Sequence, residues 1–336
     1  MTAPFPRWVP ATVVPAAVAF LATCGESTTA FDPIALSQST DAVISAMENS
    51  PALQSISVLG DKMTLGAPSL VTATPPGPSH ATAASASVFP PGIPLGATFV
   101  YDPAQQKYVA SDRTGAPSNG VRFILYAVPL AAQPSEIGHV DLLDQSTALR
   151  VQAFLTGNTS PALDYTASAS VQGSGDAITA ATLSGKGSVS GGTLTVTIDT
   201  LTQTYSTSAG IGMRHKLSVA EEALSIDFQA TITLLQTLQG TLTIQQGENT
   251  TVVTGSGTLT SFSGKITHNG KEVITFSGPS SDPVFLMASG GQPTAEQLAA
   301  LKKLADFTSD LPCAIANLLK PAFKLFTPTV PSLPCS

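Results

Sequence analysis

The feature that most constrains the fold of this 336-residue chain is a period of two in its apolar residues between positions 97 and 285. In the clearest stretch, every second residue from Leu224 to Leu234 is apolar, and the residues between them are Ser, Asp, Gln or Thr. Because successive side chains of a strand point to opposite faces, this alternation predicts strands with one buried and one wet face. The same alternation recurs at 193–199 and 241–245.

The connections between these strands favour an antiparallel sheet. Asn269-Gly270 suits a two-residue hairpin turn and predicts that Ile266 faces Val273. No segment between the strands has the length and periodicity of a crossover helix, which parallel strands would require. One strand, 121–128, is apolar at both parities, so we expect it to be buried on both faces.

Helical patterns lie at the two ends of the chain. Residues 31–65 begin with Asp32-Pro33, an N-cap followed by a first-turn proline. Residues 291–336 begin with a capping-box pattern, and we expect a second helix from Cys313 to about Leu319, with Pro321 bending or ending it. The predicted fold class is therefore mainly β: a large curved antiparallel meander of about ten to thirteen strands, open or closed part-way as a half-open barrel, with the terminal helices packed on it.

The chain divides into further zones by composition. Residues 66–95 are rich in Pro, Ala and Ser and predict a linker, and we expect residues 96–290 to form the β domain.

Charged residues make up only 11% of the chain, with a formal net charge of −7. The chain therefore has no excess of basic residues that could contact phosphate groups, so we expect no nucleic-acid partner.

The first 23 residues have the layout of an export signal. They contain one base, Arg7, no acid, and an apolar span from Trp8 to Ala22. A short cationic start followed by an apolar middle is typical of a signal peptide. Two prolines, Pro10 and Pro15, lie within a span too short for a retained membrane helix.

The residues that follow the apolar span, Leu21-Ala22-Thr23-Cys24, resemble the lipobox of bacterial lipoproteins. In that family the signal is removed directly N-terminal to the Cys, and the Cys is lipidated; Thr23 stands where the family usually has Gly, Ala or Ser. The resemblance implies a tether at 24–30 and anchoring in the periplasm, at the outer membrane or at the cell surface. A competing A-x-A pattern at 17–19 instead predicts cleavage after Ala19 and a soluble product.

The other two cysteines, Cys313 and Cys335, bracket a proline-rich tail. With Cys24 assigned to lipid, we expect a disulfide between them that pins this tail, worth about 3 kcal/mol by loop closure. Two unpaired thiols are the alternative, because spacing alone does not establish a bridge.

The chain carries no motif of a known catalytic or cofactor site, so we expect neither cofactor nor metal, and no enzyme. His139 and Asp141 share one strand face, but no third metal ligand can be named. Arg214, His215 and Lys216 are interpreted as a wet strand end.

Three functions remain open. The first is a non-enzymatic structural or interaction module of the envelope, with a protein partner of unknown kind. The second is a carrier, since a curved sheet with terminal helices resembles the lipoprotein-carrier fold of the bacterial periplasm. The apolar small molecule would lie in the concave face, with Phe123, Leu125, Ile226 and Phe228 as its candidate contacts. The third is a hydrolase without recognised motifs. The run 99–128 is similar to a pattern in uncharacterised secreted bacterial proteins, which implies export but no activity.

Overall fold

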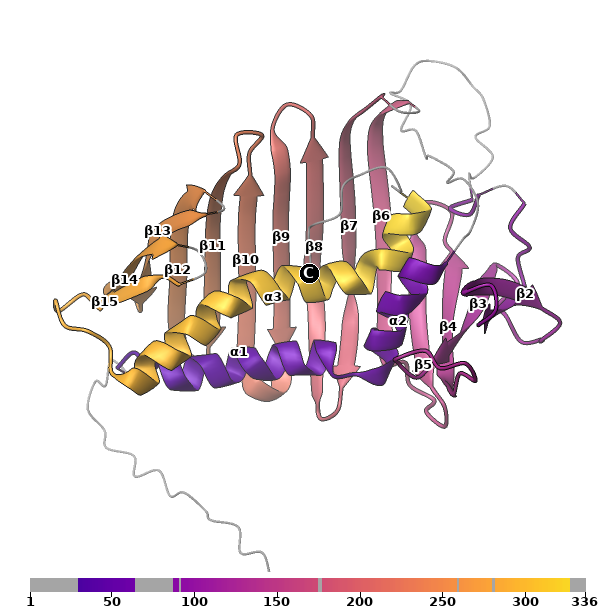
Figure 1. The fold of residues 1–336 in the computed structure, drawn as a ribbon, viewed down its shortest axis with the longest axis horizontal. Helices are drawn as coiled ribbons and strands as arrows, with labels where there is room; N and C mark the ends of the chain where they lie inside the picture. Colours follow the sequence, from indigo (N-terminus) through magenta and orange to yellow (C-terminus); the bar gives the residue numbers. More distant parts are fainter. Residues whose placement is uncertain are drawn as a thin grey trace, which may run out of the picture. The chain divides into compact units, whose positions relative to one another are not determined.

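A computed structural model describes residues 30–63, 87–90, 92–174, 177–258, 260–279 and 282–326. Within these residues, fifteen strands form one sheet in the order β15-β14-β13-β12-β11-β10-β9-β8-β7-β6-β5-β4-β3-β1-β2. All neighbours pair antiparallel except β1 and β3, which run parallel. The predicted antiparallel meander with terminal helices is therefore confirmed, although it has fifteen strands and not the expected ten to thirteen; β15 and β2 end the strand order (Figure 1).

The elements alternate little in type along the chain, since two helices come first, the strands follow, and one long helix ends it. Their bounds are α1 Pro33–Glu48, α2 Pro51–Lys62, β1 Thr98–Asp102, β2 Lys107–Ser111, β3 Gly120–Tyr126, β4 Glu136–Asp144, β5 Leu149–Leu155, β6 Leu163–Ser174, β7 Ala177–Gly191, β8 Leu194–Ser206, β9 Gly210–Val219, a 3-10 turn η1 Ala220–Glu222, β10 Leu224–Ile232, β11 Thr237–Gln246, β12 Asn249–Thr258, β13 Ser261–His268, β14 Lys271–Pro279, β15 Val284–Met287 and α3 Ala295–Phe326.

The predicted helix starts are confirmed in detail. The Asp32 carboxylate accepts hydrogen bonds from the backbone N–H groups of Ile34 and Ala35, at 2.9 and 3.2 Å. At the start of α3, the Gln297 N–H donates to Thr294 Oγ1 at 3.2 Å, and the Thr294 N–H donates to Gln297 Oε1 at 3.0 Å. Both arrangements satisfy first-turn donors that have no partner within the helix.

The prediction of two helices after residue 291 is wrong, because α3 is continuous and contains Pro312 and Pro321. Each proline removes one helical hydrogen bond and costs about 3 kcal/mol. Both prolines are buried, and Leu311, Ile315 and Leu318 around them are at most 3% exposed. Burial of these apolar side chains offsets the local cost, so the helix continues.

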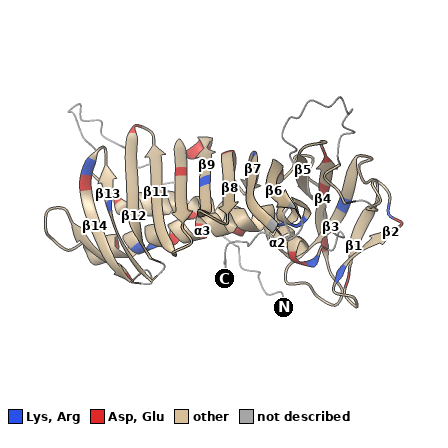
Figure 2. Cartoon of the chain, turned by 90° about the horizontal axis from the view of Figure 1, so that it is seen from above, with Lys and Arg blue, Asp and Glu red and all other residues tan. Residues whose placement is uncertain are grey.

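The three helices form a layer on one face of the sheet (Figures 1 and 2). α1 and α2 both pack against α3; α1 also lies on β7 and β8, and α2 lies on β3 to β5. Two ion pairs join the helices at their exposed side: Lys303 Nζ to Asp41 Oδ2 at 2.6 Å, and Lys320 Nζ to Asp61 Oδ2 at 3.0 Å. The helix layer and the sheet face beneath it enclose one continuous hydrophobic core.

The hairpin at Asn269-Gly270 forms as predicted, with φ of 49° and 77°. Its register differs from the prediction, because Ile266 pairs with Ile274 and not with Val273. An irregularity between Ile266 and Thr267 shifts the pairing by one residue, as a β-bulge does. The shift brings two fully buried side chains opposite each other in the core.

Candidate functional site

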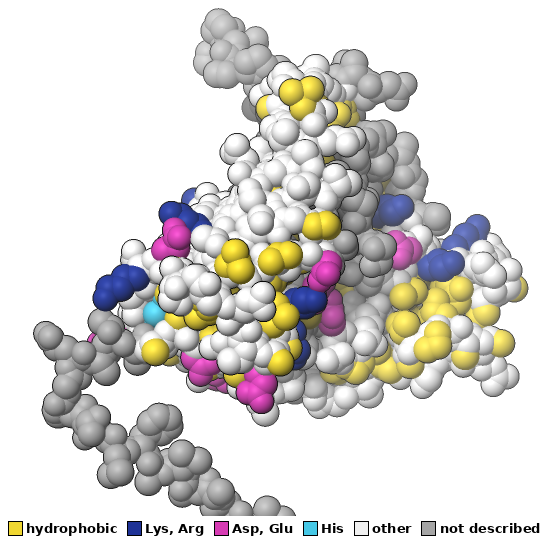
Figure 3. Space-filling view, turned by 60° about the vertical axis from the view of Figure 1, so that its left-hand side comes forward, with side chains coloured by type: hydrophobic (Ala, Val, Ile, Leu, Met, Phe, Trp, Pro, Cys, Tyr) yellow, Lys and Arg dark blue, Asp and Glu magenta, His cyan; other side chains and the backbone are white. Residues whose placement is uncertain are grey.

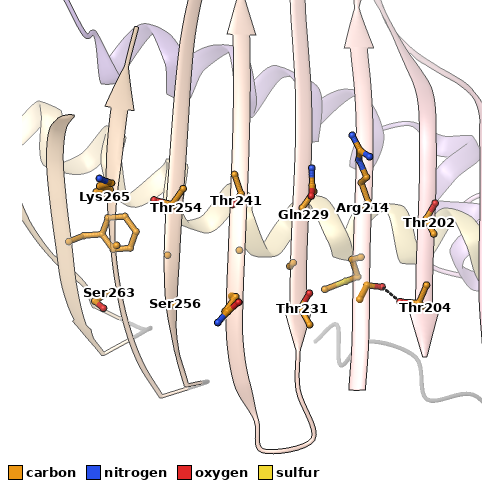
Figure 4. A pocket seen from close by; sticks show the side chains of 18 of the residues that line it. Thr202, Thr204, Arg214, Gln229, Thr231, Thr241, Thr254, Ser256, Ser263 and Lys265 are labelled. Carbon is orange, nitrogen blue, oxygen red and sulfur yellow. Dashed lines mark hydrogen bonds between the residues drawn. The ribbon is translucent and has the colours of Figure 1, made fainter. Parts of the chain in front are cut away.

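The helices leave the other face of the sheet uncovered, and the strands place polar side chains on it. On this face lies a shallow depression of about 970 Å³ that crosses seven strands, from β8 to β14. Figure 4 shows it from the helix-free side, with the helices behind the strands. This depression is the candidate site.

Strand register arranges the lining residues in two polar rows that run across the strands. The first row is Thr202, Arg214, Gln229, Thr241, Thr254, Lys265 and Thr275, each paired with the next across adjacent strands. The second row is Thr204, Gly212, Thr231, Gln239, Ser256 and Ser263. The rows are two residues apart along each strand, or about 6.6 Å. The site thus presents two parallel lines of hydroxyl and amide groups.

Small residues occupy the line between the two rows. Ala230, Gly240, Gly255 and Gly264 are register partners on four consecutive strands. Glycine in a strand interior marks a bend or a close approach of another group. On the helix-covered side, the Phe276 ring lies so close that a Cβ on Gly264 would be 2.5 Å from it. At Gly264 this close approach leaves no room for a side chain.

The two charged side chains in the depression are both basic and both paired. Arg214 donates to Asp227, with Nη2 to Oδ2 at 2.9 Å, and Lys265 Nζ lies 3.4 Å from Glu272 Oε2. The hydrogen bond from Arg214 lowers the pKa of Asp227 and, in the same way, raises that of Arg214. Neither carboxylate lines the depression. Each cation in the depression is therefore paired with a carboxylate that lies outside the depression.

A second depression, of about 530 Å³, lies on the same face near β5 to β8. Here Arg150 donates two hydrogen bonds to Asp164, at 2.9 and 2.7 Å, and Gln152 adds a third at 3.0 Å. These bonds lower the pKa of Asp164. Lys186 and Asp199 also line it, at irregularities in the pairing of β7 and β8. This depression is smaller and carries both signs of charge.

Comparison of the chain with protein-family models, curated proteins and solved structures finds no match. The site is therefore interpreted from its own geometry.

The four candidate contacts of an apolar ligand lie on the helix-covered face. Phe123 and Leu125 are fully buried, and Ile226 and Phe228 are 1% and 6% exposed. They are part of the continuous core and line neither depression. A role in ligand binding stays a prediction for these residues.

The interpretation of Arg214, His215 and Lys216 as a wet strand end is wrong for His215. Its side chain is 2% exposed and stacks on Phe228, with ring centroids 5.8 Å apart. Nδ1 of His215 has no hydrogen-bond partner among the described residues, and burial lowers its pKa to about 4. The signal was present in the sequence, because His215 has the parity of Met213 and Leu217, which face the core.

His139 and Asp141 do share a strand face, as predicted, but other groups engage them. Asp141 accepts two hydrogen bonds from Arg122, at 2.7 and 2.8 Å. The His139 ring stacks on Phe154, and its Nε2 atom lies 4.0 Å from Asp141 Oδ2. Burial, followed by the charge of Arg122, lowers the pKa of His139. In the described part of the chain, no three His, Cys, Asp or Glu side chains gather in a way that could hold a metal ion.

The remaining predicted sites concern the ends of the chain. Cys24 and Cys335 lie outside the described residues, and Cys313 lies on α3, so both the acylation and the disulfide stay predictions. The signal peptide at 1–23 and most of the linker at 66–95 also lie outside them. Of the helices that the structure describes, none combines the length and the apolar character needed to cross a membrane.

Proposed function

We propose that this chain is an exported bacterial lipoprotein, acylated at Cys24, that acts as a non-enzymatic interaction module of the cell envelope. The observation that carries the proposal is the helix-free sheet face, on which two rows of hydroxyl and amide groups line a broad depression. The N-terminal 23 residues supply the export signal, and the lipobox-like residues supply the anchor.

The pairing and orientation of the ionisable side chains near the depression favour binding over catalysis. Arg214 and Lys265 are held in ion pairs, and the adjacent His215 faces the opposite side of the sheet. A catalytic acid or base needs a perturbed pKa at a place where it reaches the substrate. The depression instead offers many neutral donors and acceptors, which suit recognition of a surface or a polymer.

The intact mass of the protein extracted from bacterial membranes tests the anchor. We expect a chain that begins at Cys24 and carries acyl groups, together with the mass of one disulfide between Cys313 and Cys335. The Cys24→Ala variant should lose acylation, and its mass should show that the chain no longer begins at residue 24. An unprocessed chain in the cytoplasm, or cleavage after Ala19 without acylation, would contradict the proposed location.

One observation favours a second candidate, carriage of an apolar ligand between the helices and the sheet. His215 Nδ1 is a polar atom without a hydrogen-bond partner in the apolar core, next to Phe228. A ligand with one polar group could satisfy it, since an unpaired buried polar group costs about 1–3 kcal/mol. Native mass spectrometry after mild purification tests this: a co-purifying lipid lost in His215→Leu supports a carrier, and a ligand-free protein contradicts it.

A further inference from the structure

We propose that the depression on the helix-free face binds an uncharged glycan strand of N-acetylated amino sugars, lying across strands β8 to β14. This inference deepens the proposed envelope function and rests on it. Its basis is the shape of the depression, the chemistry of its two rows and the balance of its charges.

The shape favours an extended polymer over a compact small molecule. Small-molecule sites enclose most of their ligand and are lined mainly by apolar groups. This depression is shallow and open, and its rows consist of Thr, Ser and Gln with two basic residues and one glycine, Gly212 (Figure 4). Seven strands with six spacings give it a length of about 29 Å. A linear chain can follow such a depression and contact both rows along its length.

The chemistry of the rows matches hydroxyl and amide groups. Each Thr and Ser hydroxyl both donates and accepts a hydrogen bond, and each Gln amide offers both an oxygen and an NH₂ group. Gln229 in one row and Gln239 in the other lie near the middle of the depression. Amino-sugar residues carry the same two groups, hydroxyls and an N-acetyl amide. Thr side chains on strands have few rotamers, so little conformational freedom is lost on binding.

The charge balance disfavours the principal competing polymers. Arg214 and Lys265 are each paired with a carboxylate, Asp227 and Glu272, which weakens their attraction for phosphate or sulfate groups. It also holds no carboxylate that would attract a basic peptide. Large exposed hydrophobic side chains occur on other segments, at Leu95, Val128, Leu234, Leu235, Val284 and Leu286. Figure 3, turned so that the left-hand side of Figure 1 comes forward, shows backbone and side chains that are neither hydrophobic nor charged over much of this surface, with hydrophobic side chains among them.

The test is binding of the β-1,4-linked hexamer of N-acetylglucosamine to the purified mature protein, measured by titration calorimetry. A matched pair of variants on strand β12 locates the site. Thr254 lines the depression, whereas Thr250 lies on the same face four residues away and does not line it. We expect Thr254→Arg to weaken binding by about tenfold or more, because its long charged side chain obstructs the middle of the row, and Thr250→Arg to leave it unchanged.

Ligand length and charge supply two further readouts. The disaccharide should bind more weakly than the hexamer, because it reaches fewer strands. A sulfated polysaccharide should not compete with the hexamer at physiological ionic strength. Thermal unfolding of both variants checks that they are folded, and Gln229→Ala should weaken binding without adding a bulky group.

Three outcomes would overturn the glycan proposal: no binding of the hexamer at millimolar concentration, equal loss of binding in Thr250→Arg and Thr254→Arg, or displacement by the sulfated polymer. The acylation experiment remains separate from these results. A protein acylated at Cys24 that binds no glycan is still an envelope module, whereas a cytoplasmic protein removes the premise of both proposals.

Discussion

The two faces of the same strands differ sharply in burial and polarity. On β9 and β10, the helix-covered face carries Leu217 and Ile226, which are at most 1% exposed, while the helix-free face carries Arg214, Asp227 and Gln229. Because successive side chains of a strand point to opposite faces, the apolar and the polar side chains of these two strands lie on separate faces of the sheet. The comparison teaches that one face holds the fold together and leaves the other free to vary with a binding partner.

The helix-covered face also contributes more to the free energy of unfolding than the helix-free face. Burying one large apolar side chain contributes about 1.5–3 kcal/mol, whereas exposed ion pairs contribute about 0–1 kcal/mol each. The helix layer therefore accounts for most of the stability that side chains add to this sheet. Substitutions on adjacent residues of one strand can break this comparison directly.

The largest contrast is expected on β11. Leu242 is 2% exposed on the helix-covered face, and Thr243 follows it on the helix-free face. Leu242→Ala should lower the free energy of unfolding by about 2–5 kcal/mol, because it removes apolar burial and leaves a cavity. Thr243→Ala should change it by about 0.5 kcal/mol or less. Urea unfolding measures both, and similar losses in the two variants would mean that both faces stabilise the fold.

A second contrast concerns the line of small residues beneath the depression. A Cβ on Gly264 would lie 2.0 Å from the Thr254 carbonyl oxygen and 2.5 Å from the Phe276 ring. Gly264→Ala should therefore cost about 1–3 kcal/mol through forced shifts of its neighbours. On Gly240 the nearest atom would be the Gln229 carbonyl oxygen at 3.6 Å, so Gly240→Ala should be neutral or stabilising by up to about 1 kcal/mol.

Thermal unfolding of the two glycine variants measures the difference, and their binding to the glycan hexamer reports on the depression itself. If the line of small residues bends the sheet, Gly264→Ala should also weaken binding. A Gly264→Ala protein as stable as the native one would show that the close approach is not required.

The sequence predicts the faces well and the depression poorly, for a physical reason. Alternation along one strand is local, so the strands, the hairpin turn and the helix caps at Asp32 and Thr294 can be derived from neighbouring residues. The depression depends on which residues of different strands become partners. Gly240, Gly255 and Gly264 are separated by 15 and 9 residues along the chain (255 − 240 and 264 − 255) and align only through register. A one-residue bulge, such as that at Ile266, is enough to change such an alignment.

The error at α3 has a related origin. Pro312 and Pro321 predict helix ends from local geometry, but both are buried, and the packing of this helix against α1 and α2 overrides that preference. The charged neighbours of His215 favour a solvent-exposed position, although its parity places it in the core. In both cases burial, which depends on distant segments, outweighs the local signal.

The smallest expected effect concerns His215. This titratable side chain lies on the helix-covered face, although its sequence neighbours predict that it is exposed. Burial lowers its pKa from 6.5 to about 4, so below pH 6.5 the unfolded chain binds a proton that the native protein does not. Stability should therefore fall as the pH falls, by about 1 kcal/mol between about pH 7 and about pH 5.5. In His215→Leu this part of the loss should disappear, because the unfolded chain no longer gains the proton at this position. Met213→Leu, on the same strand and face, should keep the loss, since it removes no titratable group. Urea unfolding at the two pH values gives the comparison, and an unchanged pH dependence in His215→Leu would place the neutral histidine outside the core.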